Sequence, residues 1–204
     1  MSTTAREQSA TGITAGVTAG VNTGATIWFT GLSGAGKSTL AETLAGLLAE
    51  QGVVATRLDG DDLREGLNAD LGFSFEDRVE NIRRVGEVAR LFALAGHLTI
   101  VSLISPFRDG RLQVRERHER SGLPFVLVHV STPLEVCERR DPKGLYARAR
   151  RGEIERFTGV SDPYEPPTTA EVVVDTEGRS PLESATELLS ALAALPLVLS
   201  RPML

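Results

Sequence analysis

The stretch from Gly31 to Thr39 constrains most strongly what this chain can fold into; it reads G-L-S-G-A-G-K-S-T. It fits G-x-x-x-x-G-K-[ST], the P-loop, whose glycines let the backbone curl so that its N–H groups point at phosphate oxygens. The apolar run 26–30 before it is typical of a buried strand, and leucines at three- and four-residue steps after it indicate a helix. This context predicts a nucleotide-binding loop rather than a flexible Gly/Ser turn, with the phosphates at the positive end of the helix dipole.

Two side chains of the motif have separate expected tasks. Lys37 should reach the β- and γ-phosphates of ATP and act in catalysis, and the Ser38 hydroxyl should hold Mg²⁺. The rest of the loop is expected to bind the phosphates, through Gly31, Leu32, Ser33, Gly34, Ala35, Gly36 and Thr39. ATP and Mg²⁺ are therefore the predicted cofactors.

Composition narrows the class of protein. The 204 residues suit one domain, and a hydrophobic content of 41% is ordinary for a soluble protein. The net charge of −5 argues against a general nucleic-acid surface, and no segment approaches the roughly 20 apolar residues that span a bilayer. A single cysteine, Cys137, excludes an internal disulfide framework and indicates a reducing compartment. We expect a cytoplasmic protein with no nucleic-acid or membrane partner.

Strand and helix patterns alternate along the chain. Strands are predicted at 26–30, 53–58, 98–104, 125–130 and 172–175, with helices at about 38–51, 76–95, 109–120, 133–140 and 181–195. This alternation predicts an α/β fold of the P-loop NTPase type, a parallel sheet with helices on both faces. The kinase domain covers 25–195, between a flexible leader at 1–24 and an apolar tail at 196–204.

Three further sequence patterns refine this prediction. Thr132 and Ser180 each precede a proline and stand three residues before a glutamate, which predicts a capping box at each helix start. The arginine-rich helix at 109–120 is most simply explained as a solvated face. The polar, arginine-rich segment 141–168 has Gly and Pro breaks and no clear core pattern, which is typical of a lid.

Polar clusters follow the first three predicted strands. The P-loop follows the first, Asp59 and Asp61 the second, and residues 105–108 the third, so all should meet beyond the carboxyl ends of the sheet. Asp61 can take the proton from an attacking hydroxyl or hold Mg²⁺, whereas Asp59 can also cap the next helix. Lys143 is the only lysine besides Lys37, which marks it as a candidate site residue.

An anionic acceptor would need cations and amides near these carboxylates. Arg64, Arg78 and Asn81 could clamp phosphate or sulfate, although Arg78 could equally be a surface charge. The chain lacks the N-K-x-D motif with which a GTPase reads guanine. A small-molecule kinase fits best; a nucleotide or sugar-acid kinase and a nucleotide-binding regulatory protein without catalysis stay open as alternatives.

Five stretches between about 25 and 178 resemble the adenylylsulfate kinase family: D-G-D-D-L-R-E-G-L-N-A-D-L-G-F-S, D-R-V-E-N-I-R-R, I-S-P-F-R, P-L-E-V-C-E-R-R-D-P-K-G-L-Y and F-T-G-V-S-D-P-Y-E. The resemblance implies an enzyme of sulfate assimilation that phosphorylates the 3′-hydroxyl of adenosine 5′-phosphosulfate (adenylyl sulfate) with MgATP. The products would be 3′-phosphoadenylyl sulfate and ADP. A homodimer is one expectation, although the sequence itself does not give the oligomeric state.

The resemblance also implies a role for each matching residue. Asp61 would lie by the acceptor 3′-hydroxyl and the metal, with Asp59 in support, and Phe73 and Phe157 would sandwich adenine. Ser105 matches a serine that carries a phosphoserine intermediate in some members. The implied substrate site consists of Asp59, Arg64, Phe73, Arg78, Asn81, Ile104, Ser105, Phe107, Lys143 and Phe157, and Arg148 is the implied ATP contact in the lid.

Two positions depart from the family pattern. Asp62 stands where the family usually has asparagine, and Ala147 and Arg148 stand where it tends to carry lysines. The first change adds a carboxylate near the anion site, and the second alters the lid that would contact ATP.

Overall fold

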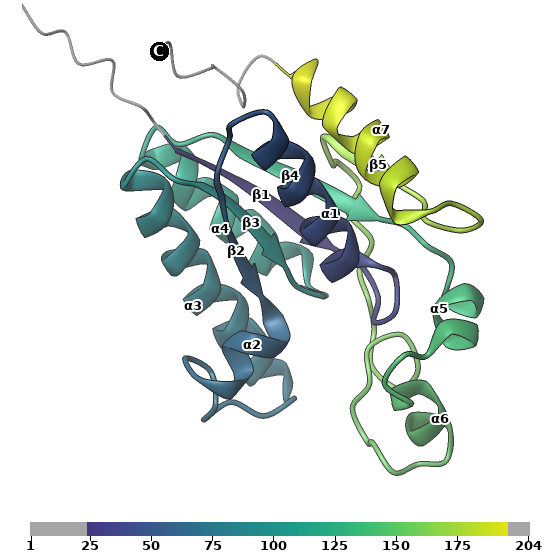
Figure 1. Ribbon diagram of the computed structural model, residues 1–204. Helices are drawn as coiled ribbons and strands as arrows, with labels where there is room; N and C mark the ends of the chain where they lie inside the picture. Colours follow the sequence, from purple (N-terminus) through teal and green to yellow (C-terminus); the bar gives the residue numbers. More distant parts are fainter. Residues whose placement is uncertain (1–23, 196–204) are drawn as a thin grey trace, which may run out of the picture.

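A parallel sheet forms the centre of the molecule in the computed structural model, which describes residues 24–195 (Figure 1). The expected tail at 196–204 and all but the last residue of the expected leader lie outside the described residues. The strands have the order β2-β3-β1-β4-β5, and each adjacent pair is parallel. Their bounds are β1 Ala25–Thr30, β2 Ala55–Asp59, β3 Leu98–Ser102, β4 Phe125–Val130 and β5 Val172–Val174.

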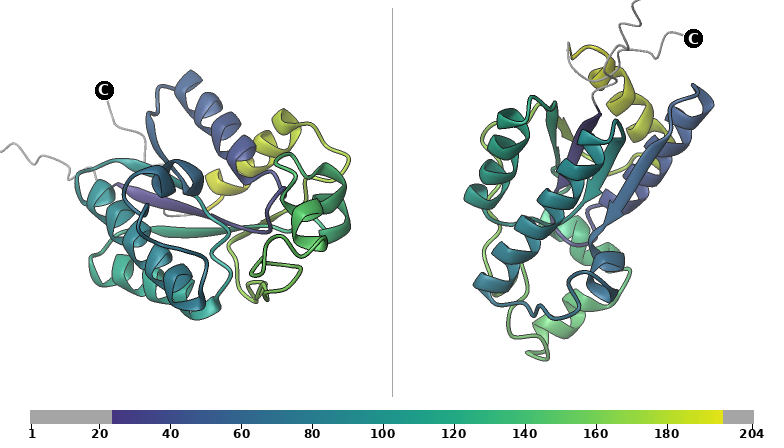
Figure 2. Two further views of the ribbon diagram at one scale, coloured as in Figure 1. Left: turned by 90° about the horizontal axis from the view of Figure 1, so that it is seen from below. Right: turned by 90° about the vertical axis from the view of Figure 1, so that its left-hand side faces the viewer.

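Helices cover both faces of this sheet (Figure 2). Their bounds are α1 Lys37–Glu50, α2 Gly60–Glu65, α3 Phe75–Leu94, α4 Arg108–Arg120, α5 Leu134–Arg140, α6 Leu145–Arg150 and α7 Pro181–Ala193. Side chains of β1 alternate between the two cores: Ile27 and Phe29 pack with α1 and α7, and Trp28 packs with α3 and α4. The predicted α/β fold with a doubly covered parallel sheet is confirmed.

The sequence patterns gave no bounds for two short helices, although the possible cap at Asp59 implied that one helix starts there. α2 starts with glycine and two aspartates, which are weak helix formers in a helix interior, and both α2 and α6 have only six residues, too few for a periodic pattern. Asp59 caps α2 by accepting a hydrogen bond from the Asp61 backbone N–H at 3.0 Å. This cap places the Asp61 side chain on the first turn of α2, directly after β2.

The two predicted capping boxes had different outcomes. At α7 the box is confirmed, with Ser180 accepting from the Glu183 backbone N–H and Glu183 accepting from that of Ser180. At α5 the prediction was wrong: the N-cap is Pro133, and the Thr132 hydroxyl donates instead to the Ala35 carbonyl at 3.1 Å. The pattern assigned this hydroxyl to the helix end as an acceptor, whereas in the structure it donates to a P-loop carbonyl.

Helix α4 is more than the predicted solvated face. Arg111 is 3% exposed and His118 is fully buried. The Nδ1 of His118 lies 2.9 Å from the Val114 carbonyl, so it carries the proton, and the Nε2 accepts from the Thr26 hydroxyl at 2.9 Å. Burial lowers the pKa of His118, because the charged imidazolium would lose its hydration there.

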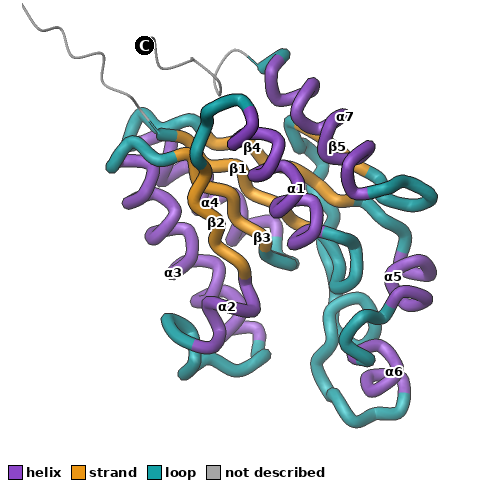
Figure 3. The backbone as a smooth tube through the Cα atoms, in the orientation of Figure 1, coloured by secondary structure: helices purple, strands orange, loops and turns teal. Residues whose placement is uncertain are grey.

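The polar segment 141–168 contains α6 and then a long loop (Figure 3). It is anchored by Tyr146 and Phe157, both buried, whose rings meet edge to face at 4.9 Å. The Tyr146 hydroxyl donates to the carbonyl of Ser33 in the P-loop at 2.9 Å. The segment therefore packs against the nucleotide loop. Over residues 24–195 the structure has no helix with the length and apolar character of a membrane span.

Candidate active site

A cavity of about 730 Å³ opens at the carboxyl ends of the strands. One wall is the P-loop and the start of α1, a second is formed by β2, α2 and α3, and a third comes from the segment 141–168. Among the predicted site residues, those that line it are Ser33, Gly34, Gly36, Lys37, Ser38, Thr39, Asp59, Asp61, Arg64, Phe73, Arg78, Asn81, Ile104, Ser105, Lys143 and Phe157. The clusters that follow the first three strands thus meet in one space, as predicted.

The P-loop backbone is shaped to receive an anion. Gly36 takes the N-cap position of α1 with φ of 96°, a left-handed conformation that suits glycine, and no side chain caps the helix. The first N–H groups of α1 therefore remain available to a phosphate. Gly31 is required for a different reason: a Cβ there would lie 2.5 Å from the Val130 carbonyl oxygen of β4.

Lys37 lies within this loop with its side chain turned inward. It is 9% exposed, and its Nζ donates to the Leu32 carbonyl at 2.7 Å. Burial lowers the pKa of Lys37 to about 8, because the ammonium loses hydration that the nearby Asp59 and Asp61 only partly replace. A phosphate group at the loop would offer the ammonium a stronger acceptor than the Leu32 carbonyl.

The far side of the P-loop is held by residues that the sequence patterns did not single out. The Thr176 hydroxyl donates to the Ala35 carbonyl at 3.0 Å, and Arg140 donates to the hydroxyl and the carbonyl of Thr176, each at 2.8 Å. Arg140 and Thr176 also line the cavity, together with Arg179 and Ser184. Thr176 follows β5 almost directly, so the rule applied to the first three strands would have indicated it.

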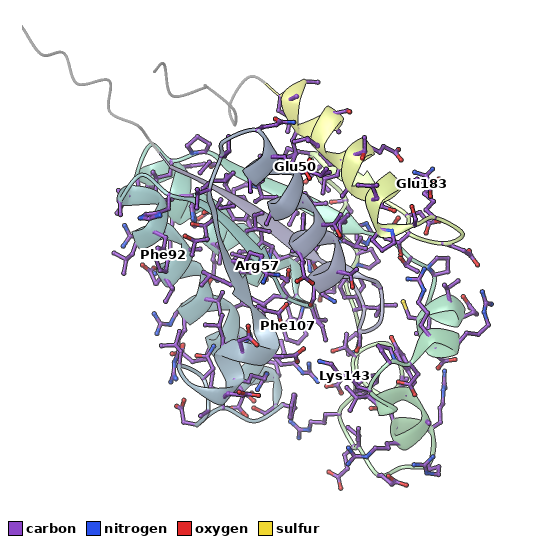
Figure 4. All side chains as sticks on the ribbon, viewed as in Figure 1. Glu50, Arg57, Phe92, Phe107, Lys143 and Glu183 are labelled. Atoms are coloured by element: carbon purple, nitrogen blue, oxygen red, sulfur yellow. The ribbon has the colours of Figure 1, made fainter. Side chains whose placement is uncertain are left out.

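Asp61 and Lys143 face each other across the cavity and form an ion pair. Lys143 lies just before α6, on the opposite side of the opening from α2 (Figure 4). Both side chains are more than half exposed, at 66% and 52%. Ser38, at the start of α1, lines the same cavity. A hydroxyl and a carboxylate are hard oxygen ligands of the kind that Mg²⁺ takes beside phosphates and water.

The wall formed by α2 and α3 carries the residues that are predicted to contact the anion. Arg64 donates to the Leu71 and Gly72 carbonyls, each at 3.1 Å, and its guanidinium lies 4.4 Å from the centre of the Phe73 ring. Arg78 is 7% exposed. It donates to the Phe73 carbonyl at 3.1 Å and to that of Arg156 at 2.7 Å, which ties α3 to the segment 141–168.

Ser105 is held in a constrained turn after β3. It is 1% exposed and has φ of 39°, which is unusual for a residue other than glycine. Its carbonyl accepts from Arg111 at 2.5 Å, and its hydroxyl accepts from the Trp28 indole N–H at 3.1 Å. No side-chain base within the described residues is hydrogen-bonded to this hydroxyl. The arrangement is that of a fixed wall residue.

Five predicted site residues are not part of the cavity lining: Gly31, Leu32 and Ala35 of the P-loop, and Phe107 and Arg148 outside it. Phe107 is 8% exposed, and its ring packs on Phe75 at 4.6 Å between centroids. Arg148 forms an ion pair with Glu153 and has a side chain that is 51% exposed. Phe107 is thus taken up in packing beside α3, and Arg148 faces solvent on α6.

Comparison with known proteins decides the family. A sequence profile of the family described as Adenylylsulphate kinase matches residues 23–175. The chain belongs to the adenylylsulphate kinase family. A member from Clostridium acetobutylicum, named adenylyl-sulfate kinase, is 56% identical over 153 residues, which are 75% of this chain and 75% of that protein.

Solved structures of the family agree with this fold. The APS kinase of Mycobacterium tuberculosis, solved in complex with AMPPNP and APS, superposes with a TM-score of 0.81 at 50% identity, covering 84% of this chain and 98% of that one. A hexameric APS kinase from Thiobacillus denitrificans has a TM-score of 0.64 at 37% identity, covering 83% of this chain and 29% of that one. The resemblance seen in the five sequence stretches is therefore confirmed at the level of the family.

Proposed function

We propose that this chain transfers the γ-phosphoryl group of ATP to the 3′-hydroxyl of adenosine 5′-phosphosulfate, giving 3′-phosphoadenylyl sulfate and ADP. The observation that supports the proposal is the shared cavity, which is lined both by the P-loop and by residues of α2 and α3. ATP would enter with its phosphates on the first N–H groups of α1. The acceptor would lie between Phe73 and Phe157, which line the same space.

The reaction forms one bond and breaks another. The 3′-oxygen attacks the γ-phosphorus, the bond to the β,γ-bridging oxygen breaks, and ADP leaves with the bonding electrons. Asp61 would take the proton from the 3′-hydroxyl once Lys143 releases it, and its ion pair with Lys143 at the cavity supports this proposal. Lys37 would follow the γ-phosphate and offset the charge that develops there.

Mg²⁺ fits the residues at this site. Ser38 and Asp61 would hold it, and its charge would neutralise the phosphate oxygens. The described residues contain no cluster of three or more His, Cys, Asp or Glu side chains that could hold a metal alone, which suits an ion that arrives with ATP and keeps water ligands.

The segment 141–168 is proposed as a lid that excludes water during transfer. Its contacts to the P-loop through Tyr146 and to α3 through Arg78 support this role. The homodimer and the cytoplasmic location also remain predictions, and light scattering during size-exclusion chromatography measures the first.

A coupled assay of ADP release tests the proposed function. With MgATP fixed, adenylyl sulfate is expected to be the preferred acceptor over AMP and gluconate. Because AMP shares the adenosine 5′-phosphate, stacking on the two aromatic rings cannot separate it from adenylyl sulfate. Preference for gluconate would support a sugar-acid kinase, and absence of turnover with any acceptor would support a regulatory nucleotide-binding protein.

A further inference from the structure

A pair of buried asparagines joins α2 and α3 behind the cavity wall. Asn81, on α3, is 4% exposed and lines the cavity. Asn68, in the turns after α2, is fully buried, and its Nδ2 donates to the Oδ1 of Asn81 at 2.9 Å. The Asn68 backbone is itself fixed, since its N–H donates to the Leu63 carbonyl at 2.8 Å and its carbonyl accepts from Leu71 at 3.1 Å.

Stability alone does not account for Asn68. Its Oδ1 is buried and has no hydrogen-bond partner in the part of the chain that the structure describes. A buried amide oxygen without a donor is destabilising, and an apolar side chain of similar shape would avoid that cost. Within residues 24–195, the hydrogen bond to Asn81 is the one side-chain hydrogen bond that the Asn68 amide makes.

The contact fixes the polarity of the Asn81 side chain. An asparagine amide has one end that only accepts and one that only donates. Because the Oδ1 of Asn81 accepts from Asn68, the Nδ2 of Asn81 is the end of the amide that remains free to bind another group. That Nδ2 has no protein acceptor within residues 24–195, and it is not one of the fully buried polar atoms that lack a partner.

The neighbouring cations make this donor more important. Arg64 and Arg78 already donate to backbone carbonyls of Leu71, Gly72, Phe73 and Arg156, so part of their capacity is used within the protein. We propose that Asn68 is a positioning residue that holds Asn81 with its amide N–H groups toward the acceptor. Asn68 thereby sets the affinity for adenylyl sulfate without touching it, an inference that rests on the proposed function.

Two substitutions of Asn68 test whether it sets the orientation of the Asn81 amide. Asn68→Leu keeps the approximate shape and removes the hydrogen bond, so the KM for adenylyl sulfate should rise about three- to tenfold, the range expected for one neutral hydrogen bond. Asn68→Asp offers an acceptor to Asn81, which should turn its Nδ2 away from the cavity and raise that KM at least as much. In both variants kcat at saturating acceptor and the KM for ATP should stay within about twofold of wild type.

A double-mutant cycle separates positioning from a structural role. In an Asn81→Ala background, Asn68→Leu should change the KM for adenylyl sulfate no further, because no amide remains to be oriented. Thr99→Val is the matched control, since the Thr99 hydroxyl on β3 is also buried without a partner within the described residues but lies outside the cavity lining. It should leave every kinetic constant unchanged.

The outcomes are distinct. An unchanged KM in Asn68→Leu, or an equal effect with and without Asn81, overturns the inference while wild-type turnover of adenylyl sulfate keeps the proposed function. Absence of wild-type turnover removes the proposed function instead. If Asn68→Leu does not fold, Asn68→Ser takes its place with the same expectation, because the serine hydroxyl is too short to reach Asn81.

Discussion

Replacing Arg78 with alanine tests how the acceptor side of the cavity is built. The change removes a buried guanidinium that donates to the Phe73 carbonyl at 3.1 Å and to the Arg156 carbonyl at 2.7 Å. It also removes an ion pair with Asp162 at 3.7 Å, a carboxylate that is 26% exposed and therefore partly hydrated. The Arg156 contact is the one that ties α3 to the segment 141–168.

The size of the effect follows from the hydrogen bond that the Arg78 guanidinium is expected to donate to the bound acceptor. A charge-assisted hydrogen bond to a buried anion contributes about 1.5–3 kcal/mol. This corresponds to roughly a tenfold to hundredfold change in an equilibrium constant. The exposed part of the Asp162 pair adds little, because solvent screens it. We therefore expect Arg78→Ala to raise the KM for adenylyl sulfate at least about tenfold, with the KM for ATP nearly unchanged.

The assay varies one substrate while the other is saturating. Arg83→Ala is the control, because Arg83 is on the same helix but is 46% exposed and pairs with Glu80 rather than with the segment 141–168. It should change neither constant appreciably. If Arg78→Ala instead raised the KM for ATP and spared that for adenylyl sulfate, the assignment of α3 to the acceptor would be reversed.

Further outcomes are expected at four residues. Lys37→Ala and Lys37→Arg should both abolish transfer while the circular dichroism spectrum stays native, because the planar guanidinium of arginine cannot replace a compact ammonium among backbone amides. In the wild type, the KM for ATP should rise as the pH is raised through the Lys37 pKa of about 8, because the neutral amine binds phosphate more weakly. Asp61→Asn should lower kcat by about 10²- to 10⁴-fold with little change in acceptor KM, the signature of a lost general base. Ser105→Ala should keep most of kcat if transfer is direct, and a loss of several orders of magnitude with unchanged binding would indicate a phosphoserine route. His118→Gln should reduce the loss in free energy of unfolding that the wild type shows between pH 7.5 and pH 5.5, as measured by urea unfolding. In the wild type, burial lowers the pKa of His118 in the folded state. Below about pH 6.5 the unfolded chain therefore binds more protons than the folded chain, and the free energy of unfolding decreases as the pH is lowered.

The sequence predicted the parts of the fold that depend on local pattern and sheet geometry. Apolar runs located the strands, and the rule that ligands bind at their carboxyl ends correctly assigned the P-loop, Asp59, Asp61 and Ser105 to one cavity. The cap that Asp59 could form is confirmed at α2, and Asp59 also lines the cavity.

Features set by distant packing were not predictable from the same patterns. Thr132 fits a capping box, but its hydroxyl serves a carbonyl 97 residues earlier in the chain. Arg111 belongs to a charge run typical of a surface, and its guanidinium is buried against the carbonyls of Ser105 and Glu165. The Asn68 side chain, in the turns after α2, donates to Asn81 on α3, a partner that the local sequence does not indicate. In each case the local sequence is compatible with several partners, and only the tertiary fold chooses one.

The ion pair between Lys143 and Asp61 acts as a weak latch across the mouth of the cavity. Because both side chains are largely hydrated, the pair contributes about 1 kcal/mol or less, so it favours the latched arrangement by a factor of about five at most. Such a latch pairs Asp61, the proposed proton acceptor, with Lys143 when no substrate is bound, yet a bound substrate can displace it at small cost. Added salt loosens it further, since screening acts on exposed charges first.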